Sequence, residues 1–153
     1  MKLKTLSLIL LSALFIISCG GDKKDKTPVS KTEVKVETPS DPMQDKGIGP
    51  VKSITLGDLD QALADQGKEI FTLKCSACHK ITKRFVGPGL AGVTERRTPE
   101  WIMNMILNPE LMVAENQIAK DLLAEYLAPM ANQNLTEIEA RQILEYLRTK
   151  KAE

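Results

Sequence analysis

Two cysteines and a histidine stand together in the stretch Cys75-Ser76-Ala77-Cys78-His79, and they offer two thiols and one imidazole. Two thiols three positions apart can each add to one vinyl group of the same porphyrin, and the adjoining imidazole can bind the iron from one side. The pattern therefore predicts one covalently attached c-type haem, held by Cys75, Cys78 and His79.

Other interpretations of a Cys-x-x-Cys pair are open. A closed zinc site needs four nitrogen or sulfur ligands, and the chain has three cysteines and one histidine, with another role expected for Cys19. A thioredoxin-like redox pair belongs in a βαβ setting, which the sequence pattern does not indicate. A chance match is the remaining alternative. The haem interpretation is favoured because the chain also begins with an export signal.

The first residues combine a basic start with an apolar run over residues 6–17. The run is shorter than the roughly 20 residues of a membrane span, and it predicts a secretory signal peptide over residues 1–18. Its end, Ile16-Ile17-Ser18-Cys19, resembles a bacterial lipobox, which implies cleavage before Cys19 and acylation of that cysteine. An ordinary cleaved signal with a stray cysteine is the alternative. We expect a lipid-anchored protein on the periplasmic side of a bacterial membrane.

The composition changes after the lipobox. Residues 19–52 are rich in Lys, Asp, Thr, Pro and Ser and show no sustained apolar period, which predicts a disordered tether. A tether of this length has a typical reach of about 30 Å. Residues 53–153 are then expected to form the single folded domain. The net charge of +1 does not indicate nucleic-acid binding.

Four helix signals occur in this domain. A helix is expected over residues 59–73, capped by Asp58 or Asp60, with one apolar face made of Leu59, Leu63, Ile70 and Leu73. Thr98-Pro99 begins a second helix that stops before Asn108-Pro109, and a third covers residues 118–127. Thr136 and Glu139 are expected to form a capping box at the start of the last helix.

Three further residue types near the haem have expected roles. A haem-ligating histidine normally donates its second ring N–H to a carbonyl, and the turn Gly87-Pro88-Gly89-Leu90 can supply one near Pro88. Trp101, the only tryptophan, either lines the haem pocket, hydrogen-bonds a haem propionate or is ordinary core. Because His79 is the only histidine, the next soft ligand is a methionine; Met130, in a loop after Pro129, is favoured over Met112.

The order of these features resembles that of a class I monohaem cytochrome c, over about residues 55–150. The resemblance implies an all-α fold in which the first and last helices cross near Gly67, Phe71, Ile143 and Tyr146, with the haem enclosed by helices and loops. It also implies His79 and Met130 as axial ligands, with Pro88 and Leu90 in the cofactor-binding segment. Many relatives have Pro directly after this Met, whereas here Pro129 precedes it.

A haem with His and Met ligands has no open iron position, so we expect an electron carrier and not an enzyme. Methionine ligation raises the potential, which favours electron delivery to a terminal oxidase or to a reductase, such as one for nitrogen oxides. Two alternatives stay open: a five-coordinate haem protein that acts on or senses gas or peroxide, and an electron-entry subunit fixed to one larger respiratory enzyme.

Charge is distributed unevenly along the domain. Six basic residues and one acid lie between Lys74 and Arg97, whereas eight acids and two bases lie between Glu100 and Glu145. The basic run surrounds the haem signature, so we expect a positive docking face for acidic redox partners. An ordinary solvated surface is the alternative.

Overall fold

The computed structural model describes residues 41–152. The expected signal peptide, the expected lipidation site Cys19 and most of the expected tether lie outside this range. Within it the chain forms six helices and no strand, which confirms the all-α prediction. They are α1 (Gln61–Lys74), α2 (Val93–Arg96), α3 (Pro99–Leu107), α4 (Pro109–Glu115), α5 (Gln117–Tyr126) and α6 (Glu137–Arg148). None of the described helices is long and apolar enough to cross a membrane.

The helices begin where short polar side chains cap them. The carboxylate of Asp60 accepts from the amide of Leu63 at the start of α1, and Thr98 accepts from the amide of Trp101 at the start of α3. At α6 the reciprocal capping box between Thr136 and Glu139 is present, as the sequence predicts. Each cap satisfies a backbone N–H that would otherwise lack a partner.

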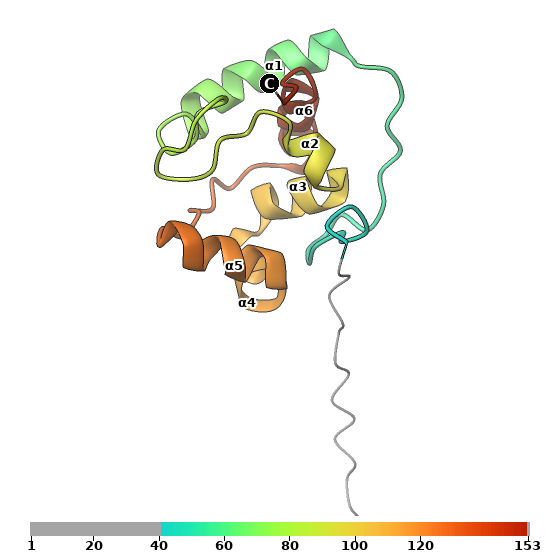
Figure 1. The fold of residues 1–153 in the computed structure, drawn as a ribbon. Coiled ribbons are helices and arrows are strands. Elements are labelled where there is room, and N and C mark those ends of the chain that lie inside the picture. The colour runs from blue at the N-terminus through green and yellow to red at the C-terminus, as the bar shows by residue number, and fades with distance from the viewer. Residues whose placement is uncertain (1–40, 153) are drawn as a thin grey trace, which may run out of the picture. The chain divides into compact units, whose positions relative to one another are not determined.

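The first and last helices cross, as the family resemblance implies, and Figure 1 shows α1 lying across α6. A Cβ atom on Gly67 would overlap the backbone carbonyl of Gln142, so the crossing brings the two backbones close together. Beside it, the rings of Phe71 and Tyr146 lie 5.3 Å apart between centroids. This close contact holds the C-terminal end of α1 in place against α6, and the Cys-x-x-Cys-His motif begins at that end.

The buried face of α1 differs from the expected one. Leu73 is 81% exposed and Leu59 is 44% exposed, whereas Ala64, Gly67 and Phe71 are buried. The crossing point uses the small residues Ala64 and Gly67, because two helices with large side chains at the contact cannot approach as closely. The expected apolar face is therefore wrong for Leu59 and Leu73, whereas Ile70 packs against the core and the helix itself is confirmed.

The boundary of the folded domain also differs from the expected one. Residues 45–57, here called the strap, are ordered and packed, with Asp45 and Val51 only 4% exposed. The side-chain amide of Asn104 on α3 donates to the carbonyls of Lys46 and Val51 and accepts from the amide of Val51. The domain therefore includes residues that the composition predicts to be tether.

Candidate functional site

One pocket collects the residues that the sequence singles out for chemistry. Its lining includes Cys75, Cys78, His79, Pro88, Leu90 and Met130. Its walls come from the end of α1, the loop over residues 86–90, α3, α5, the loop over residues 128–133 and α6. Most of the lining is apolar, including Val93, Ile102, Ile106, Leu122, Ile143 and Leu147. The pocket therefore offers a large flat group an apolar environment.

The two cysteines lie in a tight turn that continues α1. The amide of Cys75 donates to the carbonyl of Phe71, and the amides of Cys78 and His79 both donate to the carbonyl of Cys75. No disulfide joins Cys75 and Cys78. Burial and the neighbouring Cys78 raise the pKa of Cys75 to about 11. The turn therefore presents two thiols and the imidazole from one short segment.

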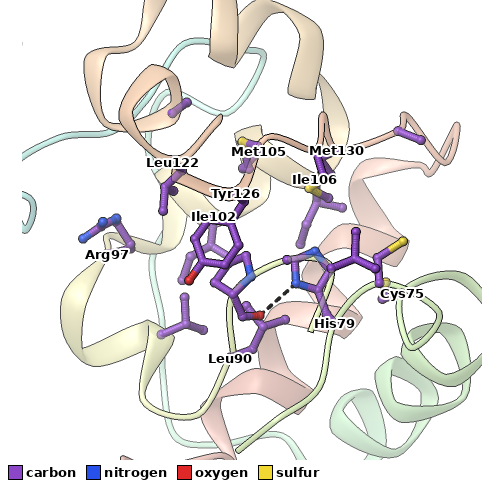
Figure 2. Close-up of a pocket in the computed structure, with 18 of the residues that line it drawn as sticks. Cys75, His79, Leu90, Arg97, Ile102, Met105, Ile106, Leu122, Tyr126 and Met130 are labelled. Atoms are coloured by element: carbon purple, nitrogen blue, oxygen red, sulfur yellow. Dashed lines mark hydrogen bonds between the residues drawn. The ribbon is translucent and has the colours of Figure 1, made fainter. Parts of the chain in front are cut away.

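The imidazole of His79 is fixed from behind. Its Nδ1 lies 3.0 Å from the carbonyl oxygen of Pro88, which is the contact expected from the sequence (Figure 2). With Nδ1 as the N–H donor, the lone pair of Nε2 is left for a metal. The amide of Gly87 donates to the carbonyl of Cys78, which ties the loop that carries Pro88 to the motif itself.

The methionines of the domain differ in whether they line the pocket. Met130 is half-buried, lines the pocket and lies in the loop between α5 and α6; Met105 of α3 also lines the pocket (Figure 2). Met112 is fully buried outside the lining, and its sulfur accepts a hydrogen bond from the amide of Ile48 at 3.1 Å. Of the two candidates that the sequence leaves open, only Met130 therefore shares a pocket with His79.

Trp101 lines the pocket and is 5% exposed. Its indole N–H donates to the side-chain oxygen of Asn116 at 3.1 Å, so it is already engaged and is not directed to a propionate. Of the three roles that the sequence leaves open for Trp101, pocket wall and core apply together.

Two polar residues of the lining were not predicted from the sequence. Arg97 has its guanidinium 5.3 Å from the ring centroid of Trp101, and its pKa is lowered by burial and by the neighbouring Arg96. Tyr126, at the end of α5, also lines the pocket (Figure 2). The signal that could have pointed to Arg97 is a basic residue two positions before the helix start at Pro99, and Tyr126 continues the apolar register of α5.

The residues present fit a covalent haem. The donor set of two thiols, one imidazole with Nε2 free and one thioether suits an iron porphyrin with two attachment points. The position of Gly87 adds a second observation, because a Cβ there would lie 2.5 Å from Cε1 of His79. The absence of a side chain at residue 87 therefore makes room for the imidazole in the orientation that it takes.

Comparison with known proteins gives the same identification. The family model named Cytochrome c matches residues 64–151. Cytochrome c from Rhodothermus marinus is similar in structure, with a TM-score of 0.65 and 48% identity over 66% of this chain and 88% of that chain. An engineered form of that protein, Rma TDE, has a TM-score of 0.64 and 47% identity over 66% of this chain and 89% of its own.

A curated relative, a cytochrome c-553-like protein of Synechocystis, is 37% identical over 46 residues, which are 29% of this chain and 44% of the relative. The chain thus matches less than half the length of that relative. Because the family model covers most of the domain, the chain belongs to the cytochrome c family, with the class I fold and a covalently bound c-type haem.

Proposed function

We propose that this cytochrome is a one-electron carrier whose axial ligands are His79 and Met130. The observation that carries the proposal is that these two side chains line one pocket, whereas Met112 is buried outside it. With both axial positions filled, no open position is left for a substrate. An electron carrier therefore fits the site better than an enzyme or a gas sensor.

Each part of the pocket has a task in this function. The bound haem supplies an iron that gains and loses one electron. The Pro88 carbonyl holds the His79 ring in one tautomer and one orientation, which limits rearrangement between the two oxidation states. A thioether from Met130 favours ferrous iron and raises the potential. The apolar walls keep water away, which also favours the less charged reduced form.

Three methionine variants test the ligand assignment. Met130→Ala is expected to abolish the weak sulfur-to-ferric band in the near infrared, lower the potential and permit carbon monoxide binding to the reduced protein. Two variants serve as controls: Met112→Ala removes a thioether outside the pocket, and Met105→Ala removes one from the α3 wall of the pocket. Neither should change the near-infrared band, the potential or carbon monoxide binding. If wild type binds carbon monoxide rapidly, the five-coordinate enzyme or sensor is the correct function.

We further propose that the carrier is anchored to a bacterial membrane on its periplasmic side through Cys19 and that it passes electrons to a terminal oxidase or reductase. A reductase for nitrogen oxides is included in that class. The lipobox supports the anchor, and the potential expected from a methionine ligand supports a terminal acceptor. The alternative is an electron-entry subunit held on one larger enzyme. A rate of electron transfer that does not depend on the concentration of the acceptor would indicate this alternative.

Exposed residues next in sequence to the pocket-lining Val86 support docking through mixed apolar and basic contacts. Phe85 and Val86 are 52% and 44% exposed, with the ammonium of Lys80 4.8 Å from the ring centroid of Phe85. Part of the expected positive charge is neutralised: Arg84 forms an ion pair with Glu125 at 3.0 Å. The exposed Lys74 and Lys83 therefore carry the proposed attraction to an acidic partner.

A further inference from the structure

A buried chain of hydrogen bonds joins the strap to the pocket wall. Trp101 Nε1 donates to Asn116 Oδ1 at 3.1 Å, and Asn116 Nδ2 donates to Asp45 Oδ2 at 2.7 Å. The exposed fractions are 5% for Trp101, 2% for Asn116 and 4% for Asp45. Trp101 lines the pocket, and the other two residues lie behind it. The chain therefore connects a buried carboxylate to a side chain of the haem pocket.

The strap end of this chain is held in place by separate contacts. The hydroxyl of Thr98 donates to the backbone carbonyl of Asp45, and the amide of Gly47 donates to Asp45 Oδ1 at 2.7 Å. Asn104 clamps the backbone on either side of Gly49. The family match begins at residue 64, so the strap lies outside the part of the chain that the family model describes. This pocket wall is therefore supported from behind by a segment that the family model does not include.

The Asp45 carboxylate also acts on the pocket electrostatically. Its hydrogen-bond donors, the amides of Gly47 and Asn116, are uncharged. Its negative charge raises the pKa of Arg97, against the larger lowering effects of burial and of Arg96. Since Arg97 lines the pocket and lies against the Trp101 ring, the charge of Asp45 is felt at the pocket wall. A buried charge is screened little by salt.

We propose that Asp45 and Asn116 are positioning residues of the haem pocket: they fix the indole of Trp101 in its wall, and the Asp45 carboxylate holds the reduction potential down. A fixed negative charge favours the more positive, oxidised state of a nearby redox centre. The proposal rests on the haem and not on its sixth ligand. Failure of the Met130 assignment therefore leaves it standing, and the methionine variants distinguish the two.

The charge is tested by redox titration of the intact holoprotein. Asp45→Asn keeps an oxygen acceptor for Asn116 and removes the charge, so the potential should shift upward. Asp65→Asn, which removes the same charge from the exposed side of α1, is the matched control and should leave the potential unchanged. Arg97→Gln should shift it in the opposite direction. Equal potentials for the Asp45 and Asp65 variants would overturn the electrostatic role.

The positioning is tested with the only tryptophan of the chain as the reporter. Asn116→Ser keeps a good N-cap for α5 but is too short to bridge Trp101 and Asp45. In the reduced protein the indole N–H signal should shift, and its hydrogen exchange should become faster. Asn108→Ser, the same change at the N-cap of α4, is the control. Should Asn116→Ser not retain haem, Asp45→Ser is used instead, because it removes the acceptor that orients the Asn116 amide. An unchanged indole signal in the folded variant refutes the positioning.

Discussion

A Cβ atom on Gly87 would lie 2.5 Å from Cε1 of His79 and 2.9 Å from its Nδ1. Real Cβ contacts are longer than this, so any side chain at residue 87 must displace the imidazole or the loop. The same loop brings the Pro88 carbonyl to Nδ1. One glycine therefore determines both the space for the proximal ring and the hydrogen bond that orients it.

Gly87→Ala is expected to perturb the ligand side of the pocket. The ring must move away from residue 87, which weakens its hydrogen bond to Pro88 and lowers the basicity of the imidazole. We expect an upward shift of the reduction potential and a lower thermal midpoint. Gly57→Ala is the control, since a Cβ at residue 57 would meet no atom within 4 Å and nothing has to move. Identical potentials for the Gly87 variant and wild type would contradict this account.

Gly67→Ala should destabilise the fold in spite of a better helix propensity. The new methyl group would overlap the backbone carbonyl of Gln142, which cannot rotate away as a flexible side chain could. Overpacking of this kind costs about 1–3 kcal/mol of stability. Replacing Gly by Ala in a helix gains about 1 kcal/mol, so a clash with rigid backbone, at the upper end of that range, outweighs the gain. Denaturant unfolding of the holoprotein measures the difference. A variant as stable as wild type would mean that α1 and α6 can separate freely.

The capping box of α6 predicts a pH dependence. Hydrogen bonds from the amide and hydroxyl of Thr136, both 2.8 Å long, lower the pKa of Glu139. A carboxyl whose pKa is lower in the folded state stabilises the protein above its unfolded pKa and loses this effect as pH falls through the folded value. Glu139→Gln should therefore lower the thermal midpoint at pH 7, and the difference from wild type should close in acid. Glu137→Gln, outside the capping box, is the control.

Docking through exposed lysines predicts a dependence on salt and on the residue changed. Lys83→Glu should slow electron transfer to an acidic partner at low ionic strength, and the effect should fade as charges more than about 10 Å apart become screened near 0.1 M salt. Arg84→Gln should have less effect, because Glu125 already balances that cation. Stopped-flow rates at several salt concentrations measure both. A rate that is flat or rises with salt would argue against a positive docking face.

Cys19→Ala tests the anchor independently of the haem. Without an acylated cysteine, the protein should move from the membrane fraction to the soluble periplasmic fraction with its absorbance spectrum unchanged. Ser18→Gly, which keeps a small residue before the cysteine, should remain with the membranes. Membrane attachment of the Cys19 variant as tight as that of wild type would show that the lipobox resemblance is misleading.

The sequence was sufficient for features that depend on neighbouring residues. The haem motif, the Thr98-Pro99 start of α3 and the capping box at Thr136 are local patterns with local causes, and both helix starts lie where expected. The Asn108-Pro109 pair was interpreted only as a stop. It also begins α4, since Asn108 caps that helix and Pro109 occupies its first turn. Helices as short as α2 and α4 have too few turns to show a period.

The order of residues 45–52, the part of the strap assigned to the tether, could not be predicted, because their partners are distant in sequence. Their polar composition is typical of disorder when only neighbours are considered. The buried amides of Asn104 and Asn116 supply the hydrogen bonds that make burial of Asp45 and of the strap backbone favourable. The sequence favours Met130 over Met112 as the ligand but leaves Met112 as the alternative, for the same reason. Only the fold shows that Ile48 of the strap meets the sulfur of Met112.

The hydrogen bond between Asp45 and Asn116 joins residues 71 positions apart, and the haem-attachment motif lies inside the loop that it closes. Closing a long loop is entropically unfavourable until its partners are already in place. The strap precedes those partners in the chain, and it can dock only once α3 and the start of α5 have formed. Protection of the strap from a protease should therefore report that α3 and the start of α5 are already in place.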